Sequence, residues 1–215
     1  MVYNELNCKL DELRGELISQ IKSIANKKGY PIFRYKKEYP INLNIWGIRA
    51  IDKTTDIFND TMIVFWETIS GSWIYYLYNI TTDPGKYYLL NPINKKGTAI
   101  LKEGFYRGMW KIGYHKGNPN HKALIQVGPC TVIRDANRDS NLDFDGKEDT
   151  GYFGINCHRN TRNKIIYYIG KYSAGCQVHQ DSANFEKHFI PFVDETLKGS
   201  TVSYTLVNEK DFKLD

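Results

Sequence analysis

Short runs of aromatic and β-branched residues, each bounded by turn-forming residues, recur along most of this chain. The clearest are Met62–Trp66 and Trp73–Tyr78, which Ser70-Gly71-Ser72 joins in the manner of a β-hairpin. The same pattern returns at 42–49, 87–90, 99–102, 109–114, 123–127, 165–169 and 202–207. Strands this short at such regular spacing predict an antiparallel β-sandwich or barrel. The sixteen tyrosines agree with this, because aromatic residues favour strands.

Two helices are predicted near the ends of the chain. Residues 4–28 repeat apolar side chains every three or four positions ahead of a glycine: Leu6, Leu10, Leu13, Leu17, Ile21 and Ile24. We expect this segment (1–29) to pack on one β-rich catalytic domain (30–215), with a coiled-coil seam as the alternative. Residues 185–197 fit a second helix, capped by Asp181 or Ser182 and kinked or split by Pro191. The predicted class is mainly β (α+β).

Composition restricts the classes of partner. The chain is 41% hydrophobic and 25% charged, without low-complexity tracts, which is typical of a globular protein. A net charge of +5 suits anionic material, yet the basic residues are dispersed and no RNP-like pattern occurs, so nucleic acid is not indicated. We expect no membrane span, no secretory signal and no disulfide framework among the four cysteines. These observations predict a monomer made in the cytoplasm.

The residues most suited to chemistry lie in two neighbouring segments. His158 ends an apolar run, and Ser173-Ala174-Gly175-Cys176 opens the next element after a turn at 160–163 and a predicted strand at 165–169. Neighbouring strands would present His158 and Cys176 close together at one end of a sheet. A thiolate nucleophile and its base require such a placement. The alternative is an inert, buried cysteine, which is the commoner role of this residue.

The order of His158, Ser173, Gly175 and Cys176 resembles the signature of the L,D-transpeptidase (YkuD-like) catalytic domain, over an active-site region of about 110–180. That family places Ser/Thr-His-Gly-Cys at a similar distance after a histidine. The resemblance implies that Cys176 is the nucleophile and His158 its base. It also implies that Gly175 permits close backbone approach, that Ser173 supports the site by hydrogen bonding, and that backbone N–H groups near Cys176 form an oxyanion hole.

The chain departs from the family pattern at three positions. Ala174 replaces the second histidine, Arg159 stands where glycine is common, and no arginine follows Cys176 at the second position. These departures bear on substrate recognition more than on the nucleophile. We predict four substrate-binding residues: Tyr114, His115, Arg159 and Gln177.

Four segments resemble an uncharacterised, phage-associated branch of this family: 44–49, 81–85, 153–159 and 173–178. Members of that branch are suspected cell-wall lytic enzymes. The resemblance implies an endolysin-like hydrolase or transpeptidase acting on peptidoglycan stem peptides, with no required cofactor, that reaches the wall during phage lysis. The alternative is a non-enzymatic β-rich binding protein or virion structural protein with an inactive motif.

Oxygen-bearing side chains also alternate along one polar segment: Asp135, Asn137, Asp139, Asn141 and Asp143. This spacing partly matches a calcium loop, although Ser140 replaces the usual glycine and no glutamate closes the pattern. The alternative is a polar turn between two strands. Structural Ca²⁺ is therefore a hypothesis. The histidines show no HxH or HExxH spacing, so a zinc peptidase is not indicated.

Overall fold

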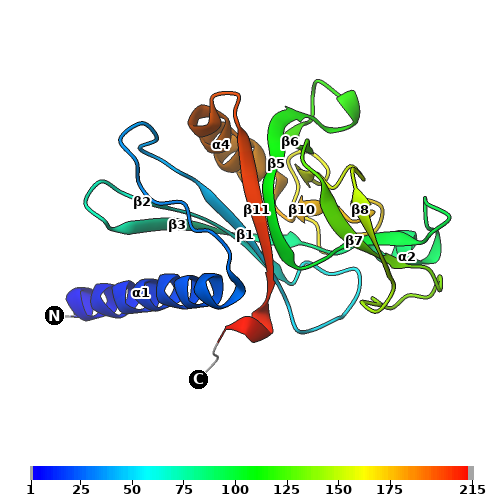
Figure 1. Cartoon of the computed structure of the whole chain (residues 1–215), viewed down its shortest axis with the longest axis horizontal. Coiled ribbons are helices and arrows are strands. Elements are labelled where there is room, and N and C mark those ends of the chain that lie inside the picture. Colours follow the sequence, from blue (N-terminus) through cyan, green and yellow to red (C-terminus); the bar gives the residue numbers. More distant parts are fainter. Residues whose placement is uncertain (1, 213–215) are drawn as a thin grey trace.

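A computed structural model describes residues 2–212, with side chains from residue 15 onward. Within these residues, eight strands close a barrel in the order β1-β11-β5-β6-β9-β10-β3-β2, and β4-β7-β8 form a separate sheet (Figure 1). The barrel strands are β1 (Asn44–Arg49), β2 (Asp60–Glu67), β3 (Trp73–Thr81), β5 (Gly104–Tyr114), β6 (Lys122–Gln126), β9 (Cys157–Arg159), β10 (Gln177–His179) and β11 (Thr201–Asn208). The small sheet contains β4 (Thr98–Leu101), β7 (Cys130–Asp135) and β8 (Lys147–Gly151).

The barrel is mixed. β1 pairs in parallel with β11, and β9 pairs in parallel with β10, whereas the other neighbouring strands are antiparallel. The mainly β class with a helix near each end is confirmed, and the sheet closes as a barrel. The expectation of purely antiparallel strands is wrong, because β1 and β11, which close the barrel, and β9 and β10 are parallel pairs. A sandwich is not confirmed.

Two segments predicted as strands have other structures. Residues 87–90 belong to the short helix α2 (Lys86–Leu90), in which the Tyr88 N–H donates to the Gly85 carbonyl (2.9 Å). Residues 165–169 form a loop that isolated bridges at Ile165 and Tyr168 join to other segments, and Ile169 is buried. Tyr167 and Tyr168 are each 72% exposed. Their aromatic β propensity has no neighbouring strand to act on, which is why this prediction is wrong.

The C-terminal helical region is continuous, and it changes from π to α hydrogen bonding just before Pro191 without the split that proline predicts. Asp181 caps α3 (Ser182–Asn184) by accepting hydrogen bonds from two backbone N–H groups. A π-helical turn (Phe185–Phe189) follows, and α4 (Ile190–Leu197) begins with Pro191 in its first turn. Apolar side chains of these helices belong to the same core as the barrel interior: Phe185, Phe189, Ile190 and Val193, with Met62, Val64, Trp110, Leu124 and Tyr204.

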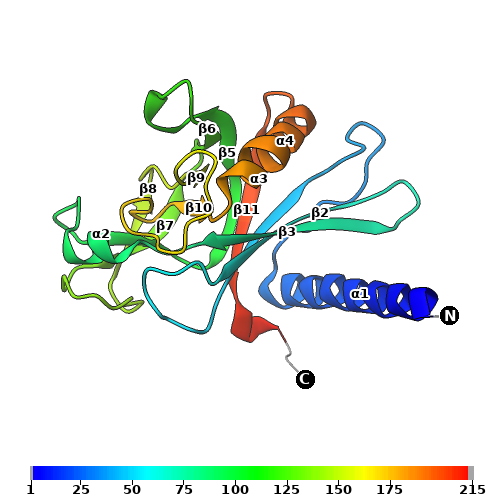
Figure 2. The ribbon, with the colours of Figure 1, turned by 180° about the vertical axis from the view of Figure 1, so that it is seen from behind.

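Helix α1 (Val2–Lys28) ends at Gly29, which adopts φ +69°, the conformation usual for a helix-terminating glycine. Ile18, Ile21 and Ile24 are buried against the outer face of the barrel, and the helix projects from that side in both views (Figures 1 and 2). Leu6, Leu10 and Leu13 lie outside the described side chains. Two 3₁₀ turns complete the described elements: His115–Gly117 and Glu209–Asp211.

Candidate active site

Cys176 directly precedes β10, and His158 is the middle residue of β9. These strands are adjacent and parallel, with Val178 opposite His158 and Gln177 opposite Cys157. The Gln177 N–H donates to the Asn156 carbonyl (2.9 Å), so the pairing reaches the residue next to Cys176. The long loop between the strands serves as the crossover that a parallel pair requires. The fold therefore brings His158 and Cys176 to one edge of the barrel.

The turn that presents Cys176 is held by Ser173. Its hydroxyl donates to the Cys176 carbonyl (2.8 Å) and accepts from the Gly175 N–H (3.1 Å). Gly175 has φ +119°, and a Cβ there would lie 2.3 Å from the Ala99 carbonyl oxygen. A side chain at this position would be strained in both respects. The close approach that Gly175 permits is thus to strand β4, which lies directly behind the turn.

Cys176 is half-buried as a residue, and its thiol donates to the Gly154 carbonyl (3.3 Å). Burial raises the pKa of this thiol to about 11, while the backbone N–H of Asn156 and the charge of Lys116 act in the opposite direction. The sulfur is therefore protonated near neutral pH.

His158 is only 3% exposed, and its Nδ1 lies 2.7 Å from the Arg159 carbonyl oxygen. A carbonyl can only accept, so Nδ1 carries the proton and Nε2 has a free lone pair. Among the described residues, Nε2 has no hydrogen-bond partner, and no hydrogen bond joins it to Cys176. Burial holds the pKa of His158 well below its usual value, and His115 lowers it further. The imidazole is therefore neutral and able to accept a proton.

Two further histidines surround His158. The His115 ring lies 4.0 Å from the His158 ring, and the His121 ring lies 5.4 Å away, centroid to centroid. Both flank the tip of the β5–β6 hairpin, whose neck is closed by the His115 N–H donating to the His121 carbonyl (2.8 Å). Burial lowers the pKa of each to about 4. His121 was not predicted as a site residue; its signal is its position opposite His115 across a Gly/Asn/Pro turn.

A cavity of about 350 Å³ lies on the imidazole side of the pair. It is lined by all three histidines, together with Lys116, Lys171 and Arg159, and by no carboxylate. Burial is the main reason that the pKa of each of these three imidazoles is lowered, and the positive charge of Lys116 lowers each pKa further. The positive charge of Arg159 is already balanced, because its guanidinium forms an ion pair with Glu186 (2.9 Å). The cavity therefore has two lysine charges that no lining carboxylate balances, and the Lys171 amine also lies over the Tyr87 ring (4.2 Å to the centroid).

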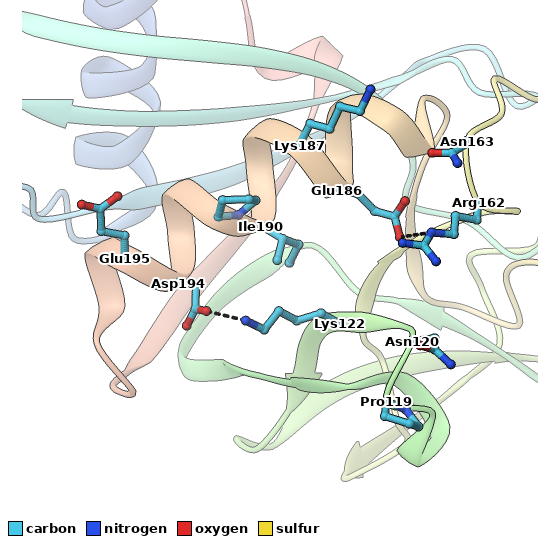
Figure 3. A pocket seen from close by; sticks show the side chains of 11 residues that line it. Pro119, Asn120, Lys122, Arg162, Asn163, Glu186, Lys187, Ile190, Asp194 and Glu195 are labelled. Atoms are coloured by element: carbon cyan, nitrogen blue, oxygen red, sulfur yellow. Dashed lines mark hydrogen bonds and ion pairs between the residues drawn. The ribbon is translucent and has the colours of Figure 1, made fainter.

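A larger cavity of about 860 Å³ lies between α4 and the β5–β6 hairpin (Figure 3). Four of its six charged residues are paired: Lys122 with Asp194 (2.6 Å) and Arg162 with Glu186 (3.4 Å), while Lys187 and Glu195 add one charge of each sign. Because these groups neutralise one another, this cavity has less electrostatic preference for a charged ligand than the cavity beside His158.

The predicted substrate-binding residues separate in space. His115 and Arg159 line the cavity beside His158, whereas Tyr114 is 49% exposed at the end of β5 and is not among the lining residues. The Gln177 side chain is fully buried and accepts a hydrogen bond from the Tyr204 hydroxyl (2.7 Å), inside the barrel. The other described cysteines, Cys130 and Cys157, are buried, and burial raises the pKa of each thiol.

The polar Asp/Asn segment connects β7 and β8. Its amides donate to its own carboxylates: Asn137 Nδ2 lies 3.1 Å from Asp139 and 2.6 Å from Asp143. In the part of the chain with described side chains (15–212), no group of three or more His, Cys, Asp or Glu is arranged to hold a metal ion. Within residues 2–212, no helix has the length and apolarity that a membrane span requires.

Comparison with known proteins leaves the family of this chain open. No family model, no curated protein and no solved structure matches it.

Proposed function

We propose that this protein is a cysteine-dependent acyl-transfer enzyme that acts on peptidoglycan stem peptides, with hydrolysis favoured over transpeptidation. The observation that carries the proposal is the unpartnered Nε2 of His158, on β9, the strand adjacent to the one that Cys176 directly precedes. A buried acceptor without a partner is unfavourable, and a base that must take a proton requires such an acceptor.

The proposed reaction begins with two neutral groups. Because the pKa of Cys176 is raised and that of His158 is lowered, a thiolate–imidazolium pair is disfavoured in the free protein. The proton therefore passes from Sγ to Nε2 as sulfur attacks the substrate carbonyl carbon, forming the S–C bond. Turning the thiol from the Gly154 carbonyl toward His158 precedes this step.

The remaining steps return the proton. The imidazolium protonates the leaving amine as the C–N bond breaks, which leaves a thioester on Cys176. Water then attacks the thioester carbonyl and gives a proton to His158. The S–C bond breaks, and that proton returns to sulfur. A second amine in place of water would give transpeptidation.

The neighbouring cavity supports a substrate with an acidic group. Its lysines, Lys116 and Lys171, meet no lining carboxylate, and peptidoglycan stem peptides carry free carboxylates. Residual positive charge in a partly enclosed cavity attracts such a group. On this proposal the protein acts on the cell wall as a monomer.

Mass spectrometry of muropeptides tests the proposal. Purified peptidoglycan is incubated with wild-type protein and with Cys176→Ala, His158→Gln and His188→Gln. We expect new cleaved or exchanged stem peptides with wild type, none with Cys176→Ala, and a rate about 10²–10⁴-fold lower with His158→Gln. His188 is exposed, so His188→Gln is the matched control and should match wild type.

Two outcomes would contradict the proposal. Unchanged muropeptides across several wall chemistries would favour a non-enzymatic binding protein. Equal product from wild type and Cys176→Ala would show that any activity does not depend on this thiol.

A further inference from the structure

The connection between β7 and β8 gathers carboxylates without a cation. Asp135 is 1% exposed, and its Oδ2 accepts from the Asp143 N–H (3.2 Å), while its Oδ1 has no hydrogen-bond partner. Among the side chains that the structure describes (15–212), no ion pair joins Asp135, Asp139 or Asp143 to a lysine, arginine or histidine. An ionised, buried carboxylate in this situation is unfavourable unless positive charge balances it.

The neighbouring carboxylates add to this imbalance. Asp139, Asp143 and Asp145 follow Asp135 in the same short connection and carry the same sign of charge. At present the Asn137 side chain separates two of these groups, because its amide nitrogen donates to both Asp139 and Asp143. A neutral amide satisfies their hydrogen bonds but leaves their charge uncompensated.

We propose that this segment binds Ca²⁺ through the carboxylates of Asp135, Asp139 and Asp143, with amide or backbone oxygens of Asn137 and Asn141. Calcium takes six to eight oxygen ligands from a flexible loop, whereas magnesium demands a tighter octahedron and keeps its waters. In the present arrangement the described side chains form no group of three His, Cys, Asp or Glu that could hold a metal ion. Binding therefore requires the loop to rearrange: the Asn137 side chain rotates, so that its oxygen replaces its nitrogen between Asp139 and Asp143. The nitrogen and oxygen of such an amide are nearly isosteric, so rotation alone makes the exchange.

The site would be structural. Leu142, inside the loop, is buried with Leu89 of α2 and Ile100 of β4. The Phe144 ring lies 5.1 Å from the Arg49 guanidinium, at the barrel. A cation that orders the loop therefore stabilises its contacts with α2, β4 and β1.

Calorimetry and thermal unfolding test this proposal independently of any enzymatic activity. Protein freed of metal by EDTA and dialysis is titrated with CaCl₂ and, separately, with MgCl₂. We expect saturable calcium binding with a Kd of about 10⁻⁵ M, weaker magnesium binding, and a rise in Tm of about 5–10 °C in millimolar calcium. Asp139→Asn and Asp143→Asn should each weaken calcium binding at least about tenfold. Glu38→Gln removes an exposed carboxylate elsewhere and should bind like wild type.

Three results would overturn the proposal. Wild-type protein could show neither binding heat nor a Tm shift in millimolar calcium, or the two loop variants could retain full calcium binding. Alternatively, Asp139→Asn could raise Tm in EDTA while calcium leaves the Tm of wild type unchanged. That result would mean that the clustered carboxylates only repel one another and bind no calcium. The wild-type titration decides the question even if a variant does not fold.

Discussion

Burial acts in opposite directions on the thiol of Cys176 and the imidazole of His158, and it leaves both neutral near pH 7. It raises the pKa of an acid that becomes anionic and lowers that of a base that becomes cationic. Gly175 holds the thiol in place at a position that no other residue suits, because φ is +119° and Ala99 lies directly behind. In the free protein, Cys176 is therefore a protonated thiol and His158 an unprotonated base.

The pH dependence of alkylation checks this pair of protonation states. The thiolate is the reactive form, so the rate at which iodoacetamide modifies Cys176 should keep rising past pH 9 toward about pH 11. The rate at Cys176 is followed by peptide mass spectrometry. Urea-unfolded protein is the control and should level near the ordinary thiol value of about 8.5. A plateau in the native protein below pH 8 would indicate a stable thiolate–imidazolium pair instead.

At the scale of elements, a buried ionic network joins β1 to the turn after β3. Arg49 pairs with Asp83 (3.0 Å) and donates to the Leu101 carbonyl (2.9 Å) of β4. Asp60 accepts from the Thr82 N–H (2.6 Å), and the Thr82 carbonyl accepts from the Gln177 side chain (3.3 Å). The network thus reaches the start of β10, beside Cys176.

Removing the cation from this network should destabilise the protein. Arg49→Met leaves Asp83 and Asp60 buried without a partner charge, and we expect a loss of about 3–5 kcal/mol at pH 7.5 in urea unfolding. Burial raises the pKa of Asp83 to about 6. The folded state therefore binds more protons than the unfolded state between about pH 4 and 6, so stability rises as pH falls through that window. The deficit of the variant should be smaller at pH 5.

Arg34→Met is the matched control for this measurement. Arg34 pairs with Glu67, but its side chain is 60% exposed, so its loss should change stability by about 1 kcal/mol or less. Equal effects of the two substitutions, or a deficit of Arg49→Met that grows toward pH 5, would contradict the account of the network.

At the scale of the whole molecule, the barrel has two apolar layers. Its interior forms one core with α4 and part of the small sheet, while the outer faces of β1, β2 and β11 form a second core with α1. Trp46, Ile63, Phe65 and Val207 are the outward-facing barrel residues in the second core. The helix therefore stabilises the closing strands without taking part in the candidate active site.

This division predicts that α1 can be weakened without altering the thiol. Ile21 is fully buried, so Ile21→Ala should lower the free energy of unfolding by about 2–5 kcal/mol through lost burial and a residual cavity. Thermal unfolding measures that loss, and the alkylation rate of Cys176 should equal that of wild type in the same buffer. A changed rate would mean that the helix influences the site through the barrel wall.

The features that sequence alone determined are local. Three of these features depend on residues a few positions apart: the end of α1 at Gly29, the β2–β3 hairpin and the Asp181 cap. Periodicity and turn chemistry were enough to predict them. Local propensity misled where the aromatic residues of 87–90 and 165–169 suggested strands, because strand formation also needs a partner.

Tertiary structure alone decided how distant segments meet. The parallel β1–β11 pair that closes the barrel, the Arg49–Asp83 pair and the grouping of His115 and His121 around His158 all join residues far apart in sequence. No short-range sequence pattern encodes such long-range contacts. They form when packing between apolar faces offsets the entropy that is lost as the intervening loop closes. The sequence could therefore identify Cys176 and His158 as candidate catalytic residues. The lysines near His158, its unpartnered Nε2 and the buried network of Arg49 could be found only from the tertiary structure.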